Sequence, residues 1–174
     1  ARVNSFGVQG LSGFAVTAEA DISGGLPQFS IVGLPDSAVR EATDRVRSAL
    51  KNLSFVWPVS RITVNLAPGD IRKTGPVYDL PVLLAILAAS GQLPVPGPED
   101  AFIGELSLDG GVRSVTGVLP MALAAQRAGM EGLFVPAENA AEAVFADGLQ
   151  IYPVKNLNQL VSHLNGRQEL QPAE

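Results

Sequence analysis

Apolar and polar residues alternate through the first thirty positions of the chain, with the period of two that is typical of a half-buried β-strand. This pattern predicts paired strands over residues 3–8 and 14–22, a turn at residues 23–25 and a third strand over residues 29–32. In the second strand, the apolar positions that recur at every other residue are Val16, Ala18, Ala20 and Ile22.

The period then changes to that of a helix. Residues 36–53 carry a single apolar face, whereas residues 82–89 are apolar on every side, which is typical of a fully buried helix. We predict that this second helix covers residues 79–89, with Asp79 as its N-cap and Pro81 in its first turn, where the missing N–H costs nothing. The apolar face of the first helix consists of Val39, Ala42, Val46, Ala49, Leu50 and Leu53. We expect the centre of the core at Leu80, Leu83, Leu84 and Leu87.

Strands and helices alternate in the remainder of the chain. A strand over residues 62–66 precedes the buried helix, and residues 102–108 and 112–115 predict a hairpin with a type I′ turn at Asp109 and Gly110. The elements predicted after this hairpin are helices at residues 118–127, 138–145 and 157–164, and strands at residues 133–135 and near residue 151. This order predicts an α/β domain with a mixed sheet (α+β).

Length and composition indicate one domain with a substantial core. The chain has 174 residues, of which 47% are hydrophobic. We place the domain at residues 1–166 and a polar tail or linker at residues 167–174. The absence of cysteine excludes disulfides, zinc–thiolate sites and cysteine nucleophiles. Because the longest apolar run is too short for a membrane span and the first four residues lack a signal-peptide pattern, we expect a cytoplasmic protein without a membrane partner.

Charge is distributed unevenly along the chain. The formal net charge is −5, but residues 1–78 hold 8 basic and 6 acidic groups, whereas residues 79–174 hold 4 basic and 11 acidic groups. Such a chain is not suited to coating nucleic acid over its whole surface, although one basic face is compatible with this distribution.

Three cations of the first predicted helix form the first candidate site. Arg40, Arg47 and Lys51 share one stripe of the helix at its 3.6-residue period, where they could grip phosphates. The alternative is an ordinary solvated face, because Asp44 lies on the same side and is spaced to pair with Arg40 and Arg47. The sequence alone favours this alternative.

Arg72 and Lys73 form the second candidate site. Two adjacent cations that precede a helix N-terminus are suited to binding an anion. The alternative is an exposed loop without a ligand. The following Thr74 and Gly75 do not make this segment a phosphate-binding P-loop, because the chain contains no Gly-x-x-x-x-Gly-Lys-Ser/Thr sequence.

Two further ionisable residues have ordinary structural explanations. Glu105 lies in a predicted strand, where a charge paired at the end of a sheet is more common than a catalytic acid. His163 is the only histidine, and no serine partner can be identified by spacing, so a packed or surface role is favoured. We therefore predict no catalytic residue and no metal ligand.

Residues 67–166 resemble the proteolytic domain of Lon, a Ser-Lys peptidase. The segments that carry the resemblance are Arg72-Lys73-Thr74-Gly75-Pro76-Val77-Tyr78-Asp79, Gly104-Glu105-Leu106-Ser107-Leu108-Asp109-Gly110, Thr116-Gly117-Val118-Leu119 and Ala124-Ala125-Gln126-Arg127-Ala128-Gly129. In this frame Val77 stands at the position of the nucleophilic serine and Leu119 at that of the general-base lysine. A serine nucleophile needs an adjacent base, so the resemblance implies the Lon scaffold, a ribosomal protein S5 domain 2-like fold, without its chemistry.

A second resemblance covers almost the whole chain. The chain is similar to the N-terminal domain of the YifB/ComM proteins. These proteins are a family of bacterial Mg-chelatase-like AAA+ ATPases. The matching segments, in order, are Phe6-Gly7-Val8, Gly25-Leu26-Pro27, Gly33-Leu34-Pro35-Asp36-Ser37-Ala38-Val39-Arg40-Glu41, Arg45-Val46-Arg47-Ser48-Ala49-Leu50, Asn65-Leu66-Ala67-Pro68 and Tyr78-Asp79-Leu80-Pro81. The resemblance implies an accessory domain of a motor that remodels DNA, for example by branch migration in recombination or natural transformation.

Three functions follow as expectations. The first is a non-catalytic domain that aids DNA engagement or assembly of the motor; the second is a protein-binding or oligomerisation domain without DNA contact. The third, a degenerate peptidase, is the least favoured because of Val77 and Leu119. The resemblance implies the protein's own C-terminal AAA+ module and neighbouring subunits of a hexamer as partners. ATP and Mg would belong to that module, so we expect no cofactor in this chain.

Overall fold

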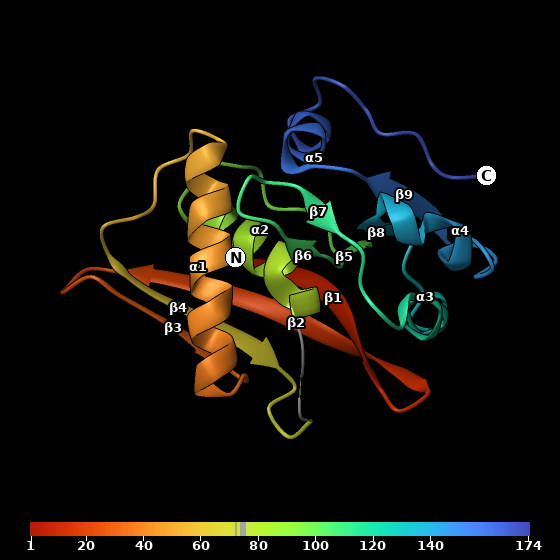
Figure 1. Ribbon diagram of the computed structural model, residues 1–174, viewed down its shortest axis with the longest axis horizontal. Helices are drawn as coiled ribbons and strands as arrows, with labels where there is room; N and C mark the ends of the chain where they lie inside the picture. The colour runs from red at the N-terminus through yellow and green to blue at the C-terminus, as the bar shows by residue number, and fades with distance from the viewer. Residues whose placement is uncertain (72, 74–75) are drawn as a thin grey trace.

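A seven-stranded mixed sheet forms the centre of the structure (Figure 1). The computed structural model describes residues 1–71, 73 and 76–174. The strands lie in the order β3-β4-β2-β1-β5-β8-β9. Their bounds are β1 Arg2–Gln9, β2 Ser12–Ser23, β3 Gln28–Val32, β4 Arg61–Ala67, β5 Asp100–Phe102, β8 Gly132–Pro136 and β9 Gln150–Val154. A second, two-stranded sheet pairs β6 Glu105–Leu106 with β7 Val112–Arg113.

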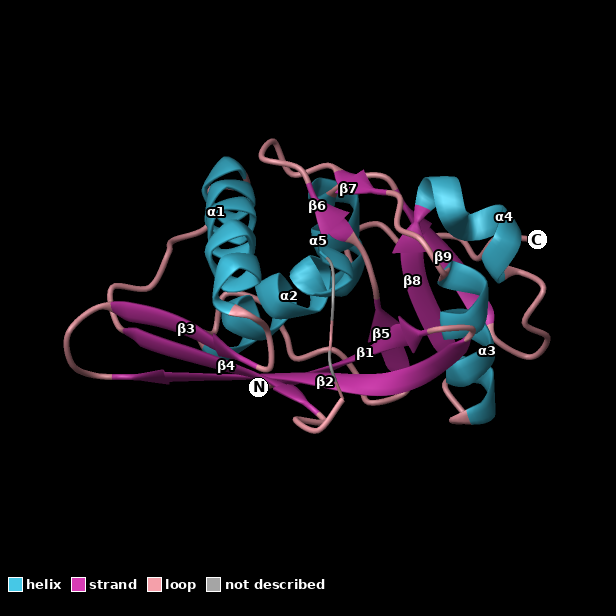
Figure 2. Ribbon diagram, turned by 60° about the horizontal axis from the view of Figure 1, so that its bottom comes forward, coloured by secondary structure: helices cyan, strands magenta, loops and turns pink. Residues whose placement is uncertain are grey.

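Five α-helices connect these strands in the described part of the chain. Their bounds are α1 Asp36–Asn52, α2 Asp79–Ala89, α3 Val118–Arg127, α4 Ala140–Ala143 and α5 Leu157–Leu164, and two short 3₁₀ turns are η1 Pro76–Tyr78 and η2 Ala137–Asn139. Figure 2 shows α1 and α2 on the same face of strands β3, β4 and β2. α3 packs against the other end of β2, where a Cβ built on Gly13 would overlap Pro120 and Ala124.

The sheet combines antiparallel and parallel pairs. β2 pairs with β1 and with β4 in antiparallel fashion, whereas β3–β4, β1–β5, β5–β8 and β8–β9 are parallel. In β4 the alternating residues Ile62, Val64 and Leu66 are buried, while Arg61 and Asn65 are exposed. This alternation buries one face of the strand beneath the helices. Together, the parallel and antiparallel pairs and the helices confirm the predicted mixed α/β fold.

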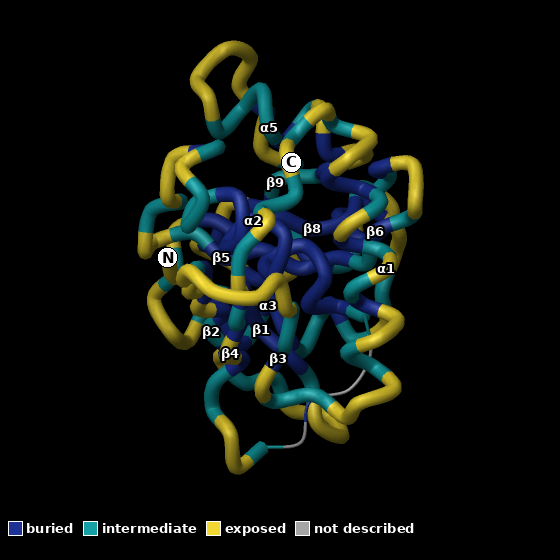
Figure 3. The backbone as a smooth tube through the Cα atoms, turned by 90° about the vertical axis from the view of Figure 1, so that its left-hand side faces the viewer, coloured by how far each residue is buried: buried dark blue, intermediate teal, exposed yellow. Residues whose placement is uncertain are grey.

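The centre of the core is α2. Every residue from Asp79 to Leu87 is buried, which confirms that Leu80, Leu83, Leu84 and Leu87 lie in the core. Figure 3 shows the buried residues gathered at the centre of the molecule, between exposed loops. A helix that is apolar on every side has no face suited to water. The hydrophobic effect therefore places the whole helix in the interior.

The predicted hairpin differs from the structure in two respects. Its first strand is divided at Gly104, so that β5 belongs to the main sheet and β6 to the small one. The type I′ turn is wrong, because only Gly110 of the predicted pair has a positive φ. Instead, the Ser107 N–H donates to the Gly111 carbonyl and the Gly110 N–H donates to Ser107, the pattern of a longer loop with a left-handed glycine.

Two segments near the C-terminus also differ in detail from the sequence prediction. The helix predicted over residues 138–145 is reduced to η2 and the single turn α4. The buried Asn139 side chain accepts from the Val115 N–H at 2.9 Å and donates to the Val115 carbonyl, which anchors this turn to a distant loop. The tail contains no helix or strand beyond residue 167, but Leu170 is buried and the Ala173 N–H donates to Ile151. None of the described helices is long and apolar enough to cross a membrane.

Candidate functional site

The position that resembles the Lon nucleophile lies in a hollow of about 310 Å³. Val77 belongs to η1, and the Gly104 N–H donates to its carbonyl at 3.0 Å. The Gly104 carbonyl in turn accepts from the Leu80 N–H at 3.1 Å, so the start of α2 is fixed against the link between β5 and β6. The residues that line the hollow are Val8, Pro76, Val77, Glu105, Ser114, Val115, Thr116 and Met121.

This hollow holds two hydroxyl groups and one carboxylate. Ser114 and Thr116 are exposed at its wall, and Glu105 is the one ionisable residue among the described residues that line it. Leu119, at the position of the Lon lysine, is partly buried near the start of α3. Neither Val77 nor Leu119 can carry a proton. The two residues at the positions of the Lon dyad therefore do not form a nucleophile–base pair.

A buried ion pair lies on the other side of Glu105. The Arg45 side chain on α1 donates Nε–H to Asp79 Oδ2 at 2.6 Å and an Nη2–H to Oδ1 at 3.1 Å. The Leu106 N–H donates to Asp79 Oδ2 at 3.1 Å. Asp79 is the first residue of α2, and its carboxylate makes no capping bond, so the predicted N-cap role is wrong. The carboxylate instead joins α1, α2 and β6.

Burial and pairing act in opposite directions on Asp79. Burial raises the pKa of Asp79 to about 6, while the Arg45 hydrogen bond and the Leu106 N–H act to lower it. The same hydrogen bond raises the pKa of Arg45 above its ordinary value, although burial acts against it. Asp79 is thus a buried acid whose charged form is favoured by one guanidinium and one backbone N–H.

A hollow of about 260 Å³ opens beside this pair. Glu41 of α1 and Glu105 of β6 both line it, with Ser37, Tyr78 and the Arg45–Asp79 pair. The Glu41 carboxylate lies 4.0 Å from Arg45, whereas no described cation lies within 4.0 Å of the Glu105 carboxylate. The pairing expected for Glu105 at the end of a sheet is therefore not found among the described residues.

Tyr78 explains why glycine stands at position 7. A Cβ built on Gly7 would overlap the Tyr78 hydroxyl and lie 2.9 Å from the Phe14 ring. Burial raises the pKa of Tyr78 to about 12, so the phenol stays neutral. Gly7 in β1 therefore provides the space for the side chain that precedes α2.

The predicted cationic stripe is exposed on α1. Arg40, Arg47 and Lys51 all lie on the side of the helix opposite to its buried residues. The predicted neutralisation by Asp44 is absent, because no ion pair within 4.0 Å joins Asp44 to a cation in the described part of the chain. The stripe is therefore available to an external anion.

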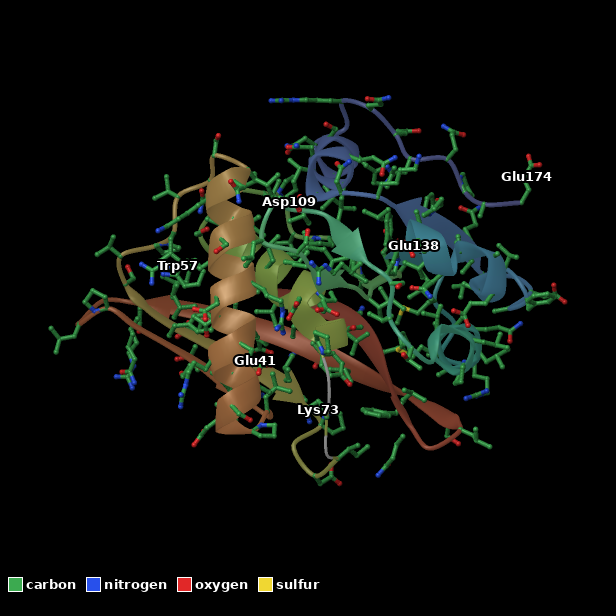
Figure 4. All side chains as sticks on the ribbon, in the orientation of Figure 1. Glu41, Trp57, Lys73, Asp109, Glu138 and Glu174 are labelled. Atoms are coloured by element: carbon green, nitrogen blue, oxygen red, sulfur yellow. The ribbon has the colours of Figure 1, made fainter. Side chains whose placement is uncertain are left out.

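Of the two cations predicted in the loop, the structure describes only Lys73. Arg72 lies outside the described residues. Lys73 is only 1% exposed, and its Nζ donates to the carbonyls of Pro68 and, at 2.9 Å, Ile71. Burial lowers the pKa of Lys73, against the effect of Asp70. Figure 4 shows Lys73 beside the lower end of α1. This ammonium is bound by the chain itself and is not presented to a ligand.

Aromatic residues lie next to the stripe, which the linear order of residues does not reveal. The ring centroids of Phe29 and Trp57 lie 5.3 Å apart, and the Arg47 guanidinium lies 5.5 Å from the Trp57 ring centre. A third hollow, of about 200 Å³, is formed here by Pro27, Gln28, Phe29, Thr43, Arg47, Trp57, Pro58, Val59 and Ser60.

Comparison with known proteins decides the family. Residues 18–139 match the family model described as "Subunit ChlI of Mg-chelatase", which is more than half of the chain. The chain belongs to the ChlI family. This match confirms the Mg-chelatase-like relationship that the sequence motifs indicate.

The similar relatives of this ChlI-family chain are longer proteins. An uncharacterized protein of Mycobacterium tuberculosis is 46% identical over 166 residues, which are 95% of this chain and 33% of that protein. Competence protein ComM of Haemophilus influenzae is 44% identical over 171 residues, 98% of this chain and 33% of ComM. Uncharacterized protein YifB of Salmonella typhimurium is 40% identical over 172 residues, 98% of this chain and 34% of YifB. The chain spans about a third of the length of these relatives.

A more distant likeness supports the fold. Lon protease of Mycolicibacterium smegmatis is 28% identical over 167 residues, which are 89% of this chain and 21% of that protease. The Lon-like fold expected from the sequence is thus confirmed. Within this ChlI-family scaffold, Arg45 and Asp79 form the buried ion pair that joins α1 to α2. This contact gives each of the two residues a structural role.

Proposed function

We propose that this chain is a non-catalytic accessory domain of a Mg-chelatase-like AAA+ ATPase that acts in DNA remodelling. Its role is to help the motor engage DNA or to order its subunits. ATP and Mg belong to an ATPase module outside this chain, and the complete protein works in the cytoplasm. The relationship to a protein named for competence supports the DNA context. Val77 and Leu119, at the positions of the Lon dyad, support the lack of catalysis.

The observation that carries DNA engagement is the exposed stripe of α1. Arg40, Arg47 and Lys51 span three turns of one helix face, and Asp44 does not neutralise them. These cations contact phosphates, so binding is weak, independent of sequence and sensitive to salt. For three phosphate contacts, the slope of log K against log salt should be about −2 to −3.

The test is fluorescence anisotropy with single-stranded and duplex oligonucleotides across a salt series. The double variant Arg40→Glu with Lys51→Glu should weaken binding to all sequences alike and flatten the salt dependence. Arg127→Glu reverses the charge of an exposed residue on α3. It is the matched control and should have little effect on binding. Equal binding by the double variant and the control would exclude the stripe as the DNA contact.

Assembly of subunits is the second candidate role, and a separate observation favours it. Leu26, Val56 and Val59 are 88%, 69% and 81% exposed around the hollow that Trp57 lines. Large apolar side chains gathered beside a Trp and an Arg are typical of a protein interface. A charge reversal confined to Arg40 and Lys51 would leave this surface intact, which separates the two roles.

A further inference from the structure

One end of the molecule combines apolar side chains with cations. We define the apolar end as Leu26, Val56 and Val59 together with the hollow that Phe29, Arg47 and Trp57 line. Leu26 precedes Pro27 of the hollow in the β2–β3 turn, and Val56 and Val59 flank Trp57 and Pro58 in the segment between α1 and β4. A hollow of about 200 Å³ is smaller than the ~300 Å³ of ordinary ligand pockets, so it suits one aromatic side chain.

The opposite end of the molecule presents an aromatic side chain among carboxylates. We define the acidic end as Phe145 with Glu138, Glu142 and Asp147. Phe145 is 74% exposed just beyond α4. Residues 128–154 contain four acidic residues and no lysine or arginine. A single phenylalanine exposed in this setting has no partner within the described part of its own chain that would bury it.

The two ends are complementary and too far apart to meet within one copy. Figure 1 places α4 at the opposite end of the long axis from α1 and the β3–β4 strands. The apolar end offers aromatic walls and the Arg47 cation, and the acidic end offers an aromatic side chain and carboxylates. A contact between different surfaces of identical chains is heterologous, and it produces a ring when the rotation closes.

We propose that the acidic end of one copy docks on the apolar end of the next copy, with Phe145 in the hollow that Phe29, Arg47 and Trp57 line. Arg47 then faces the carboxylates of Glu142 and Asp147, which supplies charge complementarity and register. The occupant is thus a second copy of this chain. This inference deepens the assembly role proposed above and does not depend on DNA binding.

Cysteine cross-linking tests this contact directly, because the chain contains no cysteine of its own. Val59→Cys and Ala141→Cys place one thiol at each end, and Ala141 is exposed on α4 one turn before Phe145, which is kept. After mild oxidation, a mixture of the two single variants should form a 59–141 disulfide dimer, and the double variant should form a ladder of oligomers. Leu11→Cys, 95% exposed and outside both ends, is the matched control and should cross-link several-fold less with either variant.

An exchange of charges between the two ends provides a second, independent test of the contact. Arg47→Glu should lower the yield of the 59–141 dimer, and Glu142→Arg in the other copy should restore it. The absence of a 59–141 product at high protein concentration, or a yield no greater than with Leu11→Cys, would overturn the proposal. If Trp57→Ala instead weakens oligonucleotide binding and no 59–141 product forms, the hollow belongs to nucleic acid. Failure of the DNA test with Arg40 and Lys51 would leave the cross-link result unaffected.

Discussion

Replacement of Arg45 by methionine should destabilise the fold in a way that depends on pH. The substitution keeps an apolar stem on α1 and removes the guanidinium that holds the buried Asp79 carboxylate at 2.6 and 3.1 Å. Asp79 is 2% exposed, so its charge would be left without a partner in a poorly hydrated site.

The magnitude follows from the burial of the pair. Breaking a buried ion pair on one side costs about 3–5 kcal/mol. The Arg45 side chain remains 20% exposed toward the 260 Å³ hollow, so water can partly hydrate the orphaned carboxylate. We therefore expect the low end of that range, about 3 kcal/mol, at pH 8. At pH 5, where Asp79 is protonated, only a hydrogen bond and packing are lost, about 1 kcal/mol.

The sign of the pH dependence follows from the pKa of Asp79. In the folded chain that pKa is raised to about 6 by burial, above the ordinary aspartate value. The stability that the neutral carboxyl contributes is therefore present below about pH 4 and is lost as pH rises through about 6. Without Arg45 the pKa of Asp79 rises further, so the difference between wild type and variant should grow above pH 6 by up to 1.36 kcal/mol per pH unit.

Urea unfolding between pH 5 and pH 8 measures this difference. Asp79→Asn is the control, because it removes the titrating group and should abolish this pH dependence. The double variant Arg45→Met with Asp79→Asn should be more stable than Arg45→Met alone at pH 8. If Arg45→Met costs the same at pH 5 and pH 8, the buried carboxylate is not the group that responds, and the reasoning fails.

Three further outcomes check the core and the absence of chemistry. Leu84→Ala in α2 should cost about 2–5 kcal/mol in urea unfolding, and a loss below about 1 kcal/mol would contradict the central place of that helix. Gly7→Ala should cost about 1–3 kcal/mol because the new methyl overlaps the Tyr78 hydroxyl, and pairing it with Tyr78→Phe should recover part of that loss. With Val77 and Leu119 at the dyad positions, the purified chain should cleave neither unfolded casein nor ATP; turnover that a substitution in this chain abolishes would refute this.

Element order and core could be predicted because they depend on local patterns. The run of apolar residues predicts a helix over residues 79–89, and the structure shows α2 with these bounds. A helix that is apolar on every side can only be buried, so its place in the core is also predicted. The same information does not specify which distant residues meet. Arg45 and Asp79 are 34 positions apart, so capping was the only role that local sequence could suggest for Asp79.

The candidate site shows the same limit more sharply. The helical period correctly places Arg40, Arg47 and Lys51 on one exposed stripe of α1. It does not reveal that Trp57, from the loop after the helix, lies beneath the Arg47 guanidinium. Nor does it reveal that Lys73 turns inward to backbone carbonyls, because a long flexible side chain has no periodic signature.

Arg47 links the two proposed surfaces, because it belongs both to the stripe and to the hollow beside Trp57. A guanidinium that faces the carboxylates of a neighbouring copy has less capacity to neutralise a phosphate, so DNA binding and the contact between copies should compete for this one residue. Arg40 and Lys51 lie on the stripe but do not line the hollow, and Val59 lines the hollow but carries no charge. Substitutions at these flanking positions, rather than at Arg47 itself, are therefore the ones that can assign each role to its own surface.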